Sequence, residues 1–156
     1  MKKLLTAAAL AAMATGASAE DVKLQLKWVT QAQFAGYYVA QAKGYYEEEG
    51  LNVTILPGGP DIAPVTLLQN GEVDVMVDWM PSALAAREMG VPVVNIAQPF
   101  ASSGMMLTCL ADTGIKEPKD FADKTLGVWF FGNEYPFLSW MSQLGLATDG
   151  SAGGVT

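Results

Sequence analysis

The stretch that decides the fold is VKLQLKWVTQAQFAGYYVAQAKGYYEEEGLNVTIL, residues Val22–Leu56. Apolar and polar residues alternate over Val22–Trp28, which predicts a β-strand with one face in the core. Gln31–Lys43 has apolar residues at helical spacing and is followed by Gly44, a residue typical of helix ends. Leu51–Leu56 is predicted as a second strand. A strand, a helix and a strand in this order predict a right-handed crossover between parallel strands.

Strands and helices continue to alternate after this unit. The predicted elements are a helix at Ile62–Gln69 with Asp61 as its N-cap, a strand at Val73–Val77, a helix at Pro81–Met89, and strands at Val91–Ala97 and Met105–Leu110. Such alternation is typical of an α/β fold with a mostly parallel sheet flanked by helices. We therefore predict that residues 20–112 form one complete α/β lobe.

After Asp112 the character of the sequence changes. A polar segment with a short helical turn, Lys116–Asp123, precedes one strand, Lys124–Phe130, and one helix, Asn133–Leu144. The Gly-rich residues 148–156 contain no predicted element. Because one strand and one helix cannot bury each other's apolar surface, we predict that residues 113–156 are a crossover and an incomplete second lobe.

The N-terminal residues have the pattern of a secretory signal peptide. Lys2 and Lys3 precede the apolar run Leu4–Ala14, and Ala17-Ser18-Ala19 is a small-x-small cleavage site. The apolar run is too short to span a bilayer, which takes about 20 residues. We expect residues 1–19 to be a signal peptide and the mature protein to be periplasmic.

Charge and reactive residues exclude several classes of function. The 156 residues include 9 basic and 16 acidic ones, and removal of Lys2 and Lys3 leaves 7 basic residues and a net charge of −9. This balance argues against nucleic acid and anionic membrane surfaces as partners. The sequence has no histidine, and Cys109 is its only cysteine. An intrachain disulfide is therefore excluded, and we expect Cys109 to be buried in its apolar strand.

Three segments carry a resemblance to a known family. They are LKWVTQAQFAGYYVAQAKGYYEEEGLNVTI (Leu26–Ile55), NGEVDVMVDWMPSALAAREMGVPVVNIAQ (Asn70–Gln98) and IKEPKDFADKTLGVWFFGNEY (Ile115–Tyr135). They resemble ABC-transporter substrate-binding proteins of the thiamine-pyrimidine-precursor type, a superfamily that includes the fungal thiamine pyrimidine synthases. The resemblance implies a type II periplasmic-binding-protein-like fold, of which this chain covers about half. It also implies a monomer that holds a small molecule between two lobes and delivers it to a permease in the inner membrane.

The candidate ligand-binding residues follow from the predicted sheet. In open α/β sheets, ligands bind outside the carboxyl ends of the strands, and aromatic and short polar residues gather in those loops here. Such a mixture suits a flat heterocycle such as an aminopyrimidine. The candidates for ring stacking are Trp28, Phe34, Tyr37, Trp79 and Tyr135, and those for hydrogen bonding are Gln98, Ser103, Asn133 and Glu134.

Some of these positions have a structural alternative. Trp28 fits a core position as well as a ligand-facing one. Tyr37 and Tyr38 are adjacent on a helix, so only one of them is expected to face inward. Trp79 is expected to be exposed in a loop, whereas Trp140 and Met141 are expected to be core residues.

Two kinds of function remain open. The fungal synthases to which the sequence is similar use iron, a cysteine-rich motif and a histidine, and this sequence has one cysteine and no histidine. We therefore expect a binding protein with no catalytic residues, metal or cofactor, and the synthase is the alternative. Riboflavin, sulfonate or taurine, and nitrate are alternative ligands. The crevice loops carry no Arg or Lys, which argues against small strong anions.

Overall fold

The computed structural model describes residues 18–156, which divide between Asp78 and Trp79 into two compact units, unit 1 and unit 2. Most of the predicted signal peptide lies outside the described residues. The first strand begins at Glu20, directly after the predicted cleavage site. The predicted boundary between lobes, at residue 112, falls within unit 2 and stays a prediction.

Unit 1 is built on a parallel sheet of three strands in the order β2-β1-β3. The strands are β1 (Glu20–Gln25), β2 (Leu51–Leu56) and β3 (Val75–Met76). Glu20 pairs with Leu51 and Gln25 with Leu56, so β1 and β2 are in register over their whole length. β1 is hydrogen-bonded on both sides because β3 pairs with its last two residues. The predicted α/β fold with a parallel sheet is confirmed.

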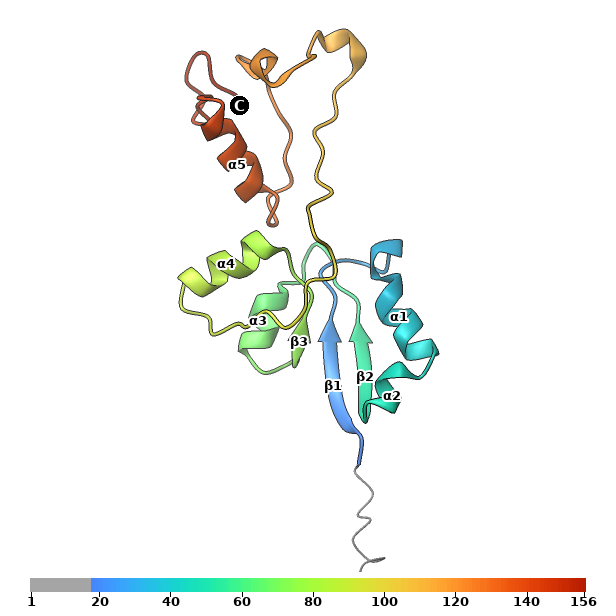
Figure 1. Cartoon of the computed structure of the whole chain (residues 1–156). Coiled ribbons are helices and arrows are strands. Elements are labelled where there is room, and N and C mark those ends of the chain that lie inside the picture. Colours follow the sequence, from blue (N-terminus) through green and yellow to red (C-terminus); the bar gives the residue numbers. More distant parts are fainter. Residues whose placement is uncertain (1–17) are drawn as a thin grey trace, which may run out of the picture. The chain divides into compact units, whose positions relative to one another are not determined.

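Helices connect and flank these strands. Between β1 and β2 lie η2 (Ala32–Phe34), α1 (Ala35–Ala42) and α2 (Tyr45–Glu48), and between β2 and β3 lies α3 (Pro64–Gln69). Figure 1 shows α1 and α2 beside β2, and α3 beside β3. The buried residues of the unit come from both strands and loops: Leu24, Gln25, Leu26, Phe34, Val53, Gly59, Pro64 and Val73.

Unit 2 is organised around helices and turns. It contains α4 (Met80–Glu88), the 3-10 turns η3 (Ala111–Thr113) and η4 (Pro118–Phe121), and α5 (Glu134–Gln143). Its core is a cluster of Phe121, Phe137, Met141 and Val155, against which Leu126 and Trp140 among others pack. The helices α4 and α5 contact each other. The prediction that Met141 is a core residue is confirmed.

Three of the predicted strands do not form. Residues 91–97 and 105–110 form no strand, and Val94, Ile96 and Met106 are exposed. A run of apolar residues supplies the side chains of a buried strand but not the partner that completes its hydrogen bonds, and Pro92 also lacks a donor. The predicted strand at residues 124–130 forms only an isolated parallel bridge, between Lys124 and Val155.

The C-terminal residues contribute to the core of unit 2. Residues 148–156 form no helix or strand, as predicted, and Val155 is buried in that core. Thr156 accepts a hydrogen bond from Leu126 at 2.8 Å and donates one to Lys124 at 3.1 Å.

The predicted N-cap at Asp61 is wrong because α3 begins later, at Pro64, with Ala63 at the N-cap. Cys109 is exposed, which corrects the expectation that it is buried.

Gly58 is required where the chain leaves β2. A Cβ at this position would lie 2.6 Å from the carbonyl carbon of Lys27 and 2.7 Å from its oxygen. The Gly58 N–H donates to the carbonyl of Trp28 at 2.9 Å, which holds the two loops together. We expect Gly58→Ala to lower the free energy of unfolding by about 1–3 kcal/mol, because the backbone must move apart.

Gly36 provides the control for this substitution. It lies in α1, and a Cβ there meets nothing within 4 Å. Gly36→Ala should raise stability by about 0.5–1 kcal/mol through lower backbone entropy of the unfolded chain. Urea unfolding of the two variants would measure the difference, and equal midpoints would show that the approach of the two loops is not tight.

A second prediction concerns the core of unit 2. Met141 is completely buried, whereas the side chain of Met106 is 85% exposed. We expect Met141→Ala to lower the free energy of unfolding by about 2–5 kcal/mol, since it leaves a cavity. Met106→Ala is the matched control and should change it by less than about 0.5 kcal/mol. Urea denaturation tests both, and a similar loss in the two variants would contradict this core.

Candidate functional site

In unit 1 the carboxyl ends of the three parallel strands meet at one edge of the sheet. Gln25, the last residue of β1, is only 3% exposed. Its amide Nε2 lies 2.9 Å from the carbonyl oxygen of Leu26, 3.4 Å from that of Leu56 and 3.0 Å from that of Pro57. One buried amide thus satisfies carbonyl groups of both strand ends. Sequence reasoning missed Gln25, although a polar residue in a strand covered on both faces is the signal that would find it.

The three predicted aromatic residues of unit 1 lie near this edge. Trp28 is half-buried in the loop after β1. Phe34 and Tyr37 are brought together, with ring centroids 6.5 Å apart. Phe34 is only 4% exposed, so little of its ring is open to a ligand. Tyr37 and its neighbour Tyr38 were predicted to differ, with only one of them facing inward. Both are half-buried, so their burial does not distinguish them.

Hydrogen bonds fix the tyrosines on their helices. The hydroxyl of Tyr46 donates to the backbone carbonyl of Tyr37 at 3.3 Å, and the hydroxyls of Tyr38 and Thr30 lie 3.0 Å apart. Burial raises the pKa of the Tyr37 hydroxyl above its usual value, and burial together with Tyr37 raises the pKa of Tyr46. Both hydroxyls are therefore neutral near pH 7 and act as uncharged hydrogen-bonding groups.

An ion pair lies at the same edge of unit 1. Lys27 Nζ is 2.6 Å from Asp78 Oδ1, and the side chains are 13% and 4% exposed. Lys27 follows β1 and Asp78 follows β3, so the pair links the ends of two strands. The Lys27 charge is therefore compensated by the protein itself.

In unit 2 two predicted site residues converge on one glycine. Gly132 donates its N–H to Glu134 Oε2 at 2.7 Å. A Cβ built on Gly132 would lie 2.9 Å from Cδ1 of Trp79 and would also meet the Ser82 hydroxyl. An indole ring and a carboxylate thus contact the same residue. The sequence identified Trp79 and Glu134 as candidates, but nothing in its pattern identified Gly132 as the residue that joins them.

The neighbours of these residues are placed by the two helices. Trp79 is the N-cap of α4 and is 41% exposed, as expected of a loop position. Asn133 is the N-cap of α5 without a side-chain capping bond, and it is half-buried. Tyr135 lies in the first turn of α5 and is exposed. Trp79, Asn133, Glu134 and Tyr135 therefore lie at the N-terminal ends of α4 and α5.

Gln98 and Ser103 have a different environment. Both lie in the exposed segment between α4 and η3. Gln98 Nε2 donates to the carbonyl of Phe100 at 3.2 Å, and Ser103 Oγ accepts from the N–H of Met105 at 3.1 Å. These bonds stabilise local turns.

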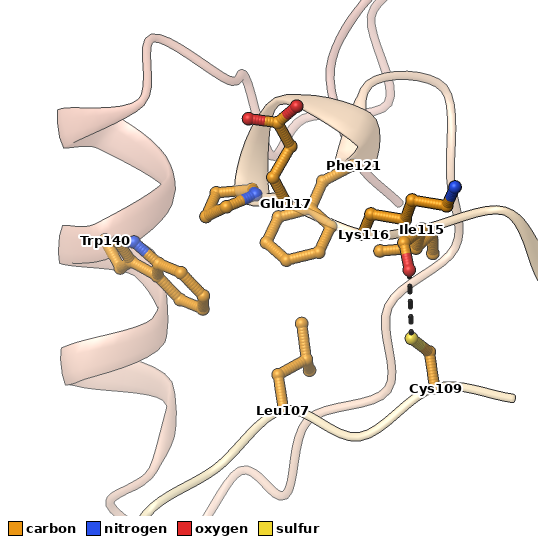
Figure 2. A pocket seen from close by; sticks show the side chains of 8 residues that line it. Leu107, Cys109, Ile115, Lys116, Glu117, Phe121 and Trp140 are labelled. Carbon is orange, nitrogen blue, oxygen red and sulfur yellow. Dashed lines mark hydrogen bonds between the residues drawn. The ribbon is translucent and has the colours of Figure 1, made fainter. Parts of the chain in front are cut away.

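A pocket of about 220 Å³ lies elsewhere in unit 2. Figure 2 shows Leu107 pointing toward the rings of Phe121 and Trp140, which pack edge to face at 5.5 Å. Cys109 Sγ donates to the Ile115 carbonyl at 3.9 Å. The residues that line the pocket are Leu107, Cys109, Ile115, Lys116, Glu117, Pro118, Phe121 and Trp140, and none was a predicted site residue. Ligand pockets usually measure about 300–1,000 Å³, so this one is small for that purpose.

The turn η4 forms one wall of that pocket and is held by a capping box. The Asp120 carboxylate accepts the N–H groups of Lys116 at 3.0 Å and Glu117 at 3.1 Å. These backbone bonds, with smaller help from Lys119 and Lys116, hold the pKa of Asp120 below its usual value. The carboxylate is therefore charged at neutral pH, as the capping geometry requires.

Residues 18–156 contain neither a membrane-spanning helix nor a cluster of metal-ligating side chains. No helix in that range has the length and apolar character needed to cross a lipid bilayer. No group of three or more His, Cys, Asp or Glu side chains in the same range is arranged to hold a metal ion.

The parallel sheet of unit 1, its flanking helices and the residues at its carboxyl edge define a partial periplasmic-binding-protein-like domain. Residues 31–148 match the family described as NMT1/THI5 like, and the chain belongs to this family. The resemblance stated from the sequence is thereby confirmed.

Relatives in this family include both binding proteins and enzymes. The chain is 31% identical over 108 residues to the formylaminopyrimidine-binding protein of Halalkalibacterium halodurans. These aligned residues are 69% of this chain and 33% of the relative. It is 29% identical over 110 residues to the 4-amino-5-hydroxymethyl-2-methylpyrimidine phosphate synthase of Schizosaccharomyces pombe, covering 70% of this chain and 32% of the relative. The chain thus spans about a third of the length of these curated relatives.

The ion pair of unit 1 generates a prediction. Asp78→Asn leaves the Lys27 charge without its partner in a poorly solvated place. We expect the substitution to lower the free energy of unfolding by about 3–5 kcal/mol. Asp61→Asn is the control, because Asp61 is exposed and does not cap α3, and it should change stability by less than about 0.5 kcal/mol. Urea unfolding measures both, and an unchanged midpoint for Asp78→Asn would show that water compensates Lys27.

Proposed function

We propose that the protein is the solute-binding component of an ABC importer and binds a small flat heterocycle, an aminopyrimidine of the thiamine-precursor type. The observation that carries this proposal is the convergence of Trp79 and Glu134 on Gly132 in a chain of this family. An indole face provides a surface on which a planar ring stacks. A carboxylate accepts hydrogen bonds from an exocyclic amino group.

The names of the relatives support the choice of ligand. The Halalkalibacterium relative is named for binding a formylaminopyrimidine, and the fungal relative for synthesising an aminopyrimidine phosphate. The two activities differ, but both names contain a pyrimidine ring with an amino group. A binding site for this ring is therefore the feature that we transfer to the present chain.

The sequence supports a role outside the inner membrane. Lys2, Lys3, the apolar run and the Ala17-Ser18-Ala19 cleavage pattern together favour export. In this proposal the mature protein is a periplasmic monomer that closes two lobes around its ligand by a hinge motion and releases it to a permease. Its net charge of −9 after removal of the signal peptide disfavours nucleic acid as a partner.

A second candidate function is pyrimidine synthesis. Relatives from Schizosaccharomyces pombe and Aspergillus parasiticus, 29% and 30% identical over the matched residues, are named as synthases. The present sequence offers no histidine and a single cysteine, so it lacks the residues that the resemblance associates with that reaction. Formation of an aminopyrimidine by the purified protein supplied with iron would favour the synthase, and its absence together with tight ligand binding favours the importer.

Calorimetry and thermal shift on the purified protein test the ligand. The ligands to compare are 4-amino-5-hydroxymethyl-2-methylpyrimidine, thiamine, riboflavin, taurine and nitrate. We expect the aminopyrimidine to stabilise the protein most, because stabilisation follows occupancy and reaches about 2.7 kcal/mol at 100 times Kd. Stabilisation by taurine or nitrate alone would refute the proposed ligand class.

A pair of tryptophan variants locates the site. Trp79→Leu removes the indole that packs on Gly132 and should weaken binding about tenfold. Trp129→Leu is the matched control, because Trp129 is exposed and its ring packs against Phe131, with centroids 5.8 Å apart. Its affinity for the aminopyrimidine should stay close to that of the unmodified protein, and equal losses in the two variants would argue against a site at Trp79.

A further inference from the structure

Gly132 precedes α5 and lies against residues at the N-terminal end of α4. From α4 come Trp79, its N-cap, and Ser82, and from α5 comes Glu134, its first residue. The side chains of Trp79 and Ser82 occupy the place where a Cβ of residue 132 would stand. The N–H of Gly132 donates to Glu134 Oε2 at 2.7 Å.

The backbone at this position also requires glycine. Gly132 is buried, and its φ of 109° lies in the region that residues with a Cβ rarely adopt. A side chain there would both strain the backbone and push against the indole of Trp79. The same backbone angle directs the N–H toward the carboxylate. Contact with the ring and the hydrogen bond to Glu134 are therefore two consequences of one conformation.

The hydrogen bond leaves the carboxylate able to accept others. An ionised carboxylate has about four acceptor positions and no donor, and the N–H of Gly132 uses one of them. A group held in this way favours a ligand that presents N–H donors beside a flat ring. It disfavours a ligand that presents an oxygen acceptor at the same place, since two acceptors face each other without a proton between them.

We propose that Gly132 is a positioning residue that holds the Glu134 carboxylate beside the Trp79 indole, so that the pair selects an amino group over an oxo group on a flat heterocycle. The inference rests on the proposed function and adds the basis of its selectivity. Gly132 does not itself touch the ligand in this mechanism. It acts through the direction of its N–H and through the space that it leaves for the indole.

The test compares two ligands that differ at one position. Calorimetry measures the affinity of the purified protein for 4-amino-5-hydroxymethyl-2-methylpyrimidine and for its 4-oxo analogue. The ratio of the two affinities is the readout, because loss of folded protein lowers both affinities and leaves their ratio unchanged. We expect the unmodified protein to prefer the amino ligand by about 10- to 100-fold, the range of a hydrogen bond to a charged group.

Gly132→Ala should reduce this preference to about threefold or less, because the carboxylate is no longer fixed beside the ring. Gly127→Ala is the matched control. Gly127 lies outside the left-handed region, and a Cβ there meets nothing within 4 Å. It should keep the preference of the unmodified protein. A Gly132→Ala variant that binds both ligands more weakly by the same factor would overturn the inference and leave Gly132 a purely structural residue.

Glu134→Gln is a second variant that leaves Gly132 in place, and a double-variant cycle with Gly132→Ala extends the test. Glu134→Gln replaces one acceptor oxygen by a donor amide and should abolish the preference on its own. If Gly132 acts through Glu134, adding Gly132→Ala to Glu134→Gln should change the ratio by less than about twofold. Additive losses would overturn the inference.

The same measurements separate this inference from the proposed function. Binding of both ligands without preference by the unmodified protein leaves the heterocycle site standing and overturns the role of Gly132. Binding of neither ligand overturns the proposed function, and the inference with it.

Discussion

Unit 1 depends on hydrogen bonding along both sides of β1. β2 pairs with β1 over its full length, β3 pairs with its end, and the pairing continues past the strand, where Val77 donates to the Gln25 carbonyl at 2.8 Å. Because all three strands are parallel, their carboxyl ends must meet at one edge. Three contacts of unit 1 lie at that edge. They are the hydrogen bonds of the Gln25 amide, the close approach of Gly58 to Lys27, and the ion pair of Lys27 with Asp78.

Unit 2 is organised by a different constraint. Its core cluster is small, and backbone geometry at a few points decides how its parts meet. The capping box of η4 fixes one wall of the pocket, and the absence of a Cβ at Gly132 leaves the space that Trp79 and Ser82 occupy. The exposed apolar residues between α4 and η3, Val94 and Ile96 among them, have no strand beside them in the described chain. Packing here is thus concentrated near α5 and the C-terminal residues.

Much of the fold could be predicted because its signals are local. β2 has the predicted bounds, since Gly50 and the Pro57-Gly58-Gly59-Pro60 turn delimit its apolar run. The helices α1 and α5 lie within the predicted segments for the same reason. The strands predicted at residues 91–97 and 105–110 do not form because a strand needs a partner, and a run of apolar residues does not supply one. Asp61 failed as a cap because α3 begins two residues after the expected start.

By itself, the sequence determined the α/β class, the order of the elements in unit 1, the acidic charge and the family, because these depend on composition, periodicity and short motifs. It also indicated which residue types suit a flat ring. Only the tertiary structure decided which of them meet. Trp79 and Glu134 share Gly132, whereas Gln98 and Ser103 bond within their own turns. Such contacts depend on how segments that are distant in the sequence pack together. Neither spacing nor propensity along the sequence carries that information.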